Sequence, residues 1–437
     1  MEKNNKKIIN AWSMYDWANS VYSLVITATI FPIYYSGVTE NTATNNLVEF
    51  FGISIQNTAL YSYSLSLSFI IIAFIAPPLS GLADFGGKRK LLWQIFAYIG
   101  AASCIALFFF TESVEYGIIC SVLASIGFAG SLVFYNAYLP SIATPDKFDQ
   151  VSAKGFSMGY AGSIILLIVA LVLIQMHDFW GFENEVLPTR LSFLLTGLWW
   201  FGFSLIPFAI IPSNVSTGRS RDNLFKKGFQ EINKVIKTLP GHPNLGKFLL
   251  AFFLYNTGVQ TIIYLATLFG SIELKLESGQ LIITILIIQL VAIAGAYIFA
   301  KLSGLKGNKY SLSVMIILWV VVCVAAYFVT SAIHFYALAF LVGLVMGGIQ
   351  SLSRATYSKL IPDDTLDHTS YFSFYDVTEK ISIVIGTVVY GVMIQITGGM
   401  RLSSVALSIF FIAGLVVLLQ TYIPHQKAES KILSNSL

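Results

Sequence analysis

Five ionisable side chains lie well inside long apolar segments of this chain: Asp16, Arg354, Asp376, Glu379 and Lys380. A charge at the centre of a bilayer costs about 2.5–3.5 kcal/mol on insertion scales, so such residues usually face a cavity or an opposite charge. A buried carboxylate beside a cation can also bind and release a proton. We therefore expect these residues to act in ion pairing, in proton transfer, or in both.

Three of the five charges fall in one segment, residues 369–396. Asp376 and Lys380 are four residues apart with the acid first, which is the favoured order for an ion pair on one helix face. Glu379 lies deeper, about 15 Å from the start of the segment at a rise of ~1.5 Å per residue.

Arg354 precedes that segment by a short connection, so we expect it to join Asp376, Glu379 and Lys380 in one buried network with equal numbers of each sign. The network has two interpretations. It neutralises itself and holds neighbouring helices together, or one of its carboxylates loads and releases a proton as access to it alternates. Glu379 is the first candidate for that proton carrier because of its depth, and Asp376 is the second.

Polar uncharged residues extend the list of candidate substrate contacts. Asp16 and Asn19 are three residues apart and share a helix face, although Asp16 has an alternative structural role near the membrane surface. Asn256 and Gln260 lie one helical turn apart in the second half of the chain, and Asn136 is a further candidate.

Twelve apolar segments, each long enough to cross a bilayer as a helix, fill most of the 437 residues. Mean hydropathy is +0.74, and charged residues make up 11% of the chain, against about 25% in an average soluble domain. Closed β-barrels lack such continuous apolar runs, so we expect an all-α membrane protein. The expected helices are 13–36, 58–82, 91–111, 116–139, 155–176, 190–211, 245–271, 280–302, 310–331, 335–360, 369–396 and 401–423.

Lysine and arginine predict the orientation of these helices. Of the 26 Lys and Arg residues, all but Arg190, Lys275 and Arg401 fall on the side of the N-terminus. Cytoplasmic loops carry this positive excess, so both termini are expected in the cytoplasm, most simply at a bacterial inner membrane. The first apolar run contains Asp16 and Asn19, which disfavours a cleavable signal peptide.

The chain divides into two six-helix bundles, 1–212 and 245–437, the second ending in a short cytoplasmic tail. The basic linker 213–244 has apolar residues at helical spacing, which predicts a surface helix, although a solvated tether is the alternative. Tyr15-Asp16 and Tyr255-Asn256 open corresponding helices of the two halves. Such half-repeats around a midline site are typical of transporters.

The loop Gly81-Leu-Ala-Asp84-Phe-Gly-Gly87-Lys-Arg89-Lys90 resembles the first cytoplasmic-loop motif of the major facilitator superfamily, G-x-x-x-D-R-x-G-R-R, with Phe85 in place of the first arginine. The glycines allow a tight turn between close helices, and an aspartate can accept amides at a helix N-terminus. The resemblance implies that Asp84 holds the two halves together through the helix at 369–396. On this interpretation the conformational latch consists of Gly81, Asp84, Gly87 and Arg89. The alternative is an ordinary turn with cytoplasmic lysines.

Four more segments resemble the UMF-type branch of this superfamily, whose relatives are the vacuolar amino-acid effluxers linked to autophagy. The resemblance implies the major facilitator fold and secondary transport of a small organic solute, such as an amino acid, by proton-coupled or facilitative efflux. Asp376 and Glu379 depart from the small or uncharged residues usual before the lysine in this pattern. The segments are 15–20, 133–140, 350–354 with 360–362, and 374–380.

Other functions find less support in the sequence. A membrane-embedded enzyme acting on lipid-linked substrates and a channel remain the alternatives. No P-loop, H-E-x-x-H or G-x-S-x-G motif occurs, so no catalytic residue, metal or cofactor is expected. The net charge of +4 follows from topology and gives no reason to expect nucleic-acid binding. The expected partners are a small-molecule substrate, protons and membrane lipids, with the protein acting as a monomer.

Overall fold

The computed structural model describes residues 2–40, 46–213, 230, 233, 236–362, 365, 367–397 and 399–424. Among these residues, eleven helices are long and apolar enough to cross a membrane. A twelfth span is α10 (Pro243–Glu273), which bends by 45° between Ile263 and Ala266. Each predicted helix corresponds to one of these spans, so the all-α membrane fold is confirmed.

Contacts divide the chain into two compact units. We call Lys6–Ala137 with Met158–Glu231 the first-half unit, and Met1–Asn5, Tyr138–Ser157 and Ile232–Leu437 the second-half unit. The short segment from Tyr138 to Ser157 thus groups with helices of the second half of the chain. The predicted division into bundles 1–212 and 245–437 stays a prediction, and most of the predicted linker helix lies outside the described residues.

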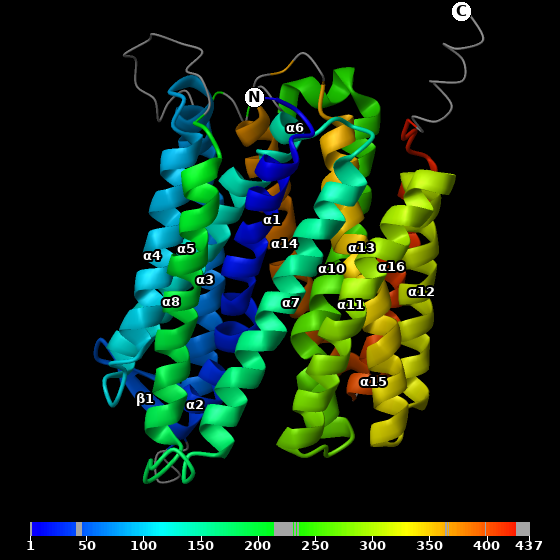
Figure 1. Cartoon of the computed structure of the whole chain (residues 1–437). Coiled ribbons are helices and arrows are strands. Elements are labelled where there is room, and N and C mark those ends of the chain that lie inside the picture. The colour runs from blue at the N-terminus through cyan, green and yellow to red at the C-terminus, as the bar shows by residue number, and fades with distance from the viewer. Residues whose placement is uncertain are drawn as a thin grey trace, which may run out of the picture. The chain divides into compact units, whose positions relative to one another are not determined.

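In the first-half unit, α4 packs on α5 and α8, α1 packs on α8, and α3 packs on α5 (Figure 1). A short antiparallel hairpin, which the sequence analysis did not predict, pairs Leu47 with Gln56. The elements are α1 (Lys6–Val21), the π-helix η1 (Tyr22–Ile30), α2 (Phe31–Val38), β1 (Leu47–Phe50), β2 (Ile53–Gln56), α3 (Asn57–Phe85), α4 (Arg89–Leu107), α5 (Val114–Asn136), most of α7 (Phe148–Gln175) and α8 (Val186–Ile210).

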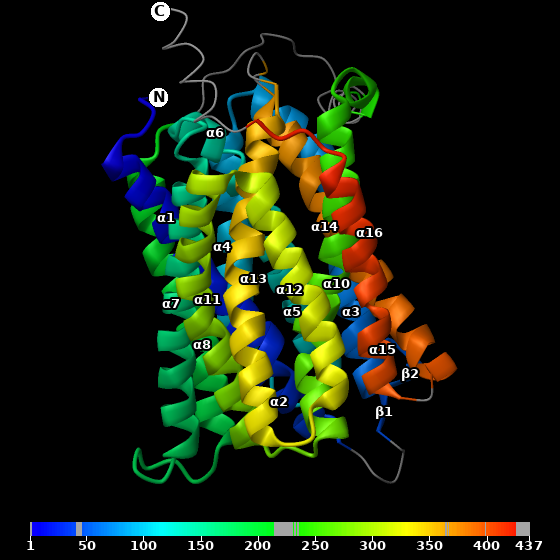
Figure 2. The ribbon, with the colours of Figure 1, turned by 90° about the vertical axis from the view of Figure 1, so that its right-hand side faces the viewer.

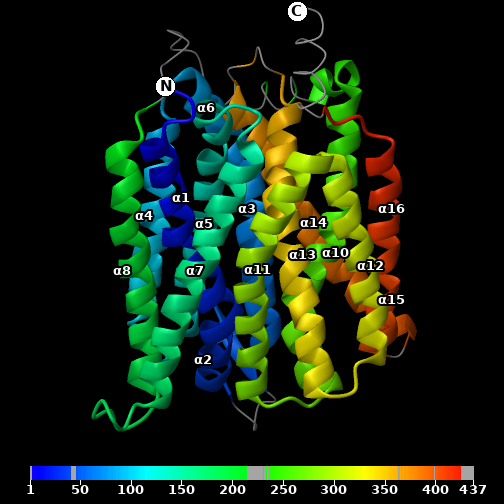
Figure 3. The same cartoon turned by 45° about the vertical axis from the view of Figure 1, so that its right-hand side comes forward.

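In the second-half unit, α11 packs closely along α13, while α10 contacts both α14 and α16 (Figure 2). Figure 3 shows the same helices from an intermediate direction. The elements are α6 (Leu139–Ile142), the start of α7, η3 (Leu239–Gly241), α10, α11 (Ser278–Lys306), α12 (Asn308–Phe328), α13 (Ala332–Leu360), α14 (His368–Thr397), α15 (Met400–Ala406) and α16 (Ser408–Leu419).

Glycine permits the closest helix crossings. A Cβ added to Gly295 of α11 would collide with the backbone of Leu344, and one on Gly347 of α13 would collide with that of Ala292. Small residues let helix backbones approach in this way inside membranes, where the hydrophobic effect does not drive association. The α11–α13 pair therefore forms a close-packed support for the polar residues of α13.

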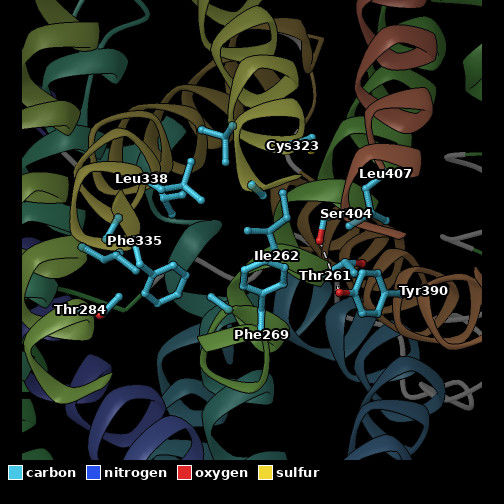
Figure 4. A pocket seen from close by; sticks show the side chains of 16 residues that line it. Thr261, Ile262, Phe269, Thr284, Cys323, Phe335, Leu338, Tyr390, Ser404 and Leu407 are labelled. Atoms are coloured by element: carbon cyan, nitrogen blue, oxygen red, sulfur yellow. Dashed lines mark hydrogen bonds between the residues drawn. The ribbon is translucent and has the colours of Figure 1, made fainter. Parts of the chain in front are cut away.

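An apolar cavity of about 60 Å³ lies inside the second-half unit near the bend of α10. Phe269, Phe335 and Tyr390 surround it, and Tyr390 forms a hydrogen bond of 3.5 Å with Ser404 (Figure 4). Apolar cavities of this kind remain dry. Thr261 lines the cavity, whereas its neighbour Gln260 bonds to a residue of α14.

Candidate functional site

Three charges on α14 form a compact group, which we call the α14 charge cluster: Asp376, Glu379 and Lys380. Lys380 Nζ lies 3.3 Å from Asp376 Oδ1 and 3.4 Å from Glu379 Oε2. The ion pair predicted from the four-residue spacing of Asp376 and Lys380 is therefore present. One ammonium group faces two carboxylates, so the cluster carries one net negative charge when all three groups are ionised.

Two amides of α10 bind α14 in and beside this cluster. Gln260 Nε2 donates to Glu379 Oε1 at 3.2 Å and approaches Asn256 Oδ1 at 3.4 Å. Asn256 Nδ2 donates to Ser382 Oγ at 2.6 Å, which ties α10 to α14 one turn further along. The predicted one-turn spacing of Asn256 and Gln260 thus presents both amides to α14, because α10 and α14 pack against each other.

Burial differs sharply within the cluster. Asp376 is only 2% exposed, and its Oδ2 atom has no hydrogen-bond partner among the residues that the structure describes. The Glu379 side chain is 27% exposed and is the most accessible of the three. Glu379 is therefore the carboxylate that a proton or a solute reaches most readily, and Asp376 is an acceptor whose hydrogen-bonding capacity is half used.

Arg354 does not bind the α14 carboxylates in the contacts that the structure describes. Its Nε donates to Ser152 Oγ at 2.9 Å and its Nη2 donates to Ser152 O at 3.0 Å. The guanidinium group also lies 4.3 Å from the ring centre of Phe156. The first turns of α7 thus supply carbonyl, hydroxyl and aromatic groups to this cation. Its place in the predicted four-charge network stays a prediction.

A second buried group, which we call the Asp149 cluster, consists of Asp149, Ser303, Asn308 and Lys359. Lys359 Nζ lies 2.7 Å from Asp149 Oδ2 and 2.9 Å from Asn308 Oδ1. Ser303 Oγ and Asn308 Nδ2 each donate to Asp149 at 2.8 Å. Both carboxylate oxygens are thus satisfied, and residues from α7, α11, α12 and α13 meet at one point.

Sequence analysis did not single out the Asp149 cluster. In the sequence, Asp149 is an acid in a short loop between two predicted helices. Lys359 is one of the lysines that predict which side faces the cytoplasm. The sequence offers one local signal, which is that an acid in the first turn of a helix is favoured by the helix dipole. That signal explains Asp149 at the start of α7 but does not identify its distant partners.

In the first-half unit, Asp16 is buried in an aromatic core. Tyr135 Oη donates to Asp16 Oδ2 at 2.6 Å, and Trp12 stacks on the Tyr135 ring with centroids 4.5 Å apart. Asn19 is buried too, and its Nδ2 atom has no partner within the described part of the chain. Asn136 is the last residue of α5 and is partly buried beside Tyr135.

Just beyond Asn19, the backbone widens into the nine-residue π-helix η1. The Thr27 carbonyl accepts a hydrogen bond from Tyr61 Oη at 3.3 Å, and Thr29 Oγ1 donates to the Leu24 carbonyl at 2.7 Å. Side-chain hydroxyls thus bind carbonyls of the irregular turn. Such widened turns occur often at functional sites, so the neighbouring Asn19 stays a candidate for a substrate contact.

The residues of the predicted latch lie at the turn between α3 and α4. Arg89 Nη2 donates to Asp84 Oδ1 at 2.9 Å, and Arg89 Nη1 donates to the carbonyl of Ala137 at 3.2 Å. Gly87 has φ of +64°, a left-handed conformation that favours glycine, and Gly81 is buried. Asp84 therefore holds α3, α4 and the end of α5 together, while its contact with α14 stays a prediction.

Comparison with known proteins identifies the family. A family model described as vacuole effluxer Atg22 like matches residues 4–431. This chain belongs to the Atg22-like family. The Atg22-like chain is 32% identical over 433 residues to the uncharacterized MFS-type transporter YxiO of Bacillus subtilis, covering 98% of this chain and 97% of that protein. It is 24% identical to autophagy-related protein 22 of Saccharomyces cerevisiae, over 87% of this chain and 80% of that one.

Solved structures agree on the fold of the Atg22-like chain. The proton:xylose symporter XylE aligns with a TM-score of 0.71 at 11% identity, covering 96% of this chain and 95% of that chain. The human organic anion transporter MFSD10 aligns with a TM-score of 0.70 at 12% identity, covering 95% and 100%. The chain is a multi-pass membrane protein with the major facilitator fold and functions as a secondary transporter.

Proposed function

We propose that this transporter exports a small organic solute, such as an amino acid, across a bacterial plasma membrane, and that Glu379 carries a proton coupled to that movement. Amino acids are suggested by the Atg22-like relatives, which are described as vacuole effluxers. The plasma membrane is suggested by the relative from Bacillus subtilis, which covers nearly the whole chain.

The geometry of Glu379 is the observation that carries the proton coupling. Its side chain is 27% exposed, whereas Asp376 and Lys380 beside it are nearly buried. Protonating Glu379 leaves one carboxylate and one ammonium group, which balance each other. Removing that proton leaves an uncompensated negative charge in the membrane, which is costly. A group that alternates between these two states can link proton binding to a change of conformation.

The Asp149 cluster supports alternating access. Asp149 belongs by sequence to the first six helices, and its partners Ser303, Asn308 and Lys359 belong to the last six. Arg354 binds Ser152 in the same way. We expect these bonds to break and re-form as helices of the two sequence halves move during the transport cycle.

The remaining sequence predictions complete the proposal. Both termini lie in the cytoplasm, residues 213–244 link the two bundles, and Asp84 with Gly81, Gly87 and Arg89 forms the latch. The protein acts as a monomer, without catalysis and without a cofactor. Ion pairs and amides make up the polar clusters described above, which suits transport better than covalent chemistry.

Uptake by the purified protein in liposomes tests this function. A panel of labelled amino acids is offered with an imposed pH gradient, without one, and with the gradient collapsed by a protonophore. We expect at least one amino acid to accumulate only while the gradient lasts. Uptake that is the same with and without the pH gradient would exclude proton coupling. If no amino acid of the panel is transported, this substrate class is excluded.

A further inference from the structure

The charge balance of the α14 charge cluster points to the kind of ligand that it binds. Lys380 is shared by two carboxylates, at 3.3 Å from Asp376 and 3.4 Å from Glu379. Asp376 Oδ2 is buried and has no hydrogen-bond partner among the described residues. Buried acceptors are normally satisfied, so an unpaired carboxylate oxygen in a membrane span needs an explanation.

The neighbouring helices do not supply the missing cation in the contacts that the structure describes. α10 faces α14 at this point with Asn256 and Gln260, neither of which is a cation. On α15, Arg401 is paired with Glu273 of α10 at 3.2 Å. The excess negative charge therefore stays at Asp376 and Glu379.

The third neighbour, α13, contributes Arg354 and Tyr357 near Tyr375 of α14. Arg354 is bound to Ser152 through both Nε and Nη2. Tyr357 Oη donates to the carbonyl of Tyr371 at 2.6 Å. Neither side chain is directed at the Asp376 carboxylate by these contacts.

We propose that the α14 charge cluster binds an organic ammonium group and releases one proton in exchange. The proposal rests on Glu379 as the proton carrier of the function proposed above. When Glu379 loses its proton to solvent, the cluster has one net negative charge, and one ammonium ion restores neutrality. The N–H groups of the ligand donate to Asp376 Oδ2 and to Glu379, whose side chain is accessible.

An ammonium group suits this cluster better than a carboxylate or a metal ion. The carboxylate of an anionic solute would meet Lys380, which two carboxylates already neutralise. Within the described residues, no group of three or more His, Cys, Asp or Glu side chains is arranged to hold a metal ion. An ammonium ion needs only acceptors and negative charge, both of which are present.

Titration calorimetry on the purified full-length protein in detergent tests the exchange. The probes are methylammonium, phenethylammonium, L-phenylalanine and 3-phenylpropionate, each measured in two buffers with different heats of ionisation. The difference between buffers gives the number of protons released per probe bound. The variants are Glu379→Gln, Glu379→Asp and the control Glu277→Gln, which alters an exposed carboxylate at the start of α11.

We expect an ammonium probe to bind with release of about one proton at the more acidic pH values. L-Phenylalanine should bind comparably through its ammonium group, whereas 3-phenylpropionate, which has none, should bind at least about tenfold more weakly. Glu379→Gln should lose both the binding and the proton release, Glu379→Asp should keep the proton release, and Glu277→Gln should match the unmodified protein. Unfolding temperatures measured alongside show that each variant is folded.

Three results would overturn this inference: no binding of either ammonium probe, equal binding of 3-phenylpropionate, or binding without proton release. A failed ligand inference is distinguishable from a failed proton coupling. If Glu379→Gln abolishes gradient-driven transport while no ammonium probe binds the unmodified protein, coupling through Glu379 stands and the ligand is wrong. If an ammonium probe binds but Glu379→Gln transports normally along a pH gradient, the coupling assignment is wrong.

Discussion

Lys359 Nζ lies 2.7 Å from Asp149 Oδ2, although 210 residues separate the two in sequence. Both side chains are at least nine-tenths buried, and Ser303 and Asn308 complete the hydrogen bonds of the carboxylate. A buried ion pair is favourable only when its remaining hydrogen bonds are satisfied, and this one meets that condition. The pair connects the first turn of α7 to the last turn of α13.

Asp149→Asn should destabilise the Asp149 cluster. Removing one partner of a buried ion pair typically costs about 3–5 kcal/mol, because the other charge stays buried and uncompensated. We expect faster hydrogen exchange in 148–157 and a loss of transport activity. Asp146→Asn alters an exposed acid just before α7 and should change neither. Unaltered exchange in Asp149→Asn would show that the ion pair contributes little to the stability of this segment.

Tyr135→Phe should destabilise the first-half unit. The substitution removes the 2.6 Å hydrogen bond from Tyr135 to Asp16 in an aromatic core, at a cost of about 1–3 kcal/mol. The unfolding temperature measures this effect. Tyr116→Phe removes a hydrogen bond from an exposed tyrosine and should shift that temperature much less. Equal shifts for the two variants would mean that the Asp16 contact contributes little.

Gly295→Ala should separate α11 from α13. The added methyl group meets the Leu344 carbonyl, which is backbone and cannot move independently of α13, and overpacking of this kind costs about 1–3 kcal/mol. Gly304→Ala lies in the same helix with no atom within 4 Å of the new carbon. We expect a lower unfolding temperature for Gly295→Ala and no decrease for Gly304→Ala. A tolerated Gly295→Ala would contradict the close crossing.

Local spacing predicted much of the fold and part of the candidate site. Hydropathy located the spans because each exceeds the thickness of the hydrocarbon core. A separation of four residues correctly placed two pairs of side chains on one helix face each. The pairs are Asp376 with Lys380 and Asn256 with Gln260. Helical periodicity fixes such relationships before any tertiary contact is known.

Contacts between distant segments could not be predicted in the same way. Arg354 was expected to reach the carboxylates of α14 because it is near them in sequence, yet it binds Ser152. Nothing in the spacing of Asp149 and Lys359 relates one to the other, since their distance depends on how four helices pack. The π-helix after Asn19 and the hairpin of β1 and β2 likewise had no signal in the apolar pattern.

Transport by Glu379→Gln in liposomes tests the proposed coupling most directly. The variant keeps the hydrogen-bonding shape of the side chain but cannot exchange a proton, so the cluster remains neutral throughout the cycle. We predict that accumulation driven by a pH gradient is lost, while exchange of labelled for unlabelled substrate continues. Accumulation that keeps the pH dependence of the unmodified protein would contradict the role of Glu379 as proton carrier.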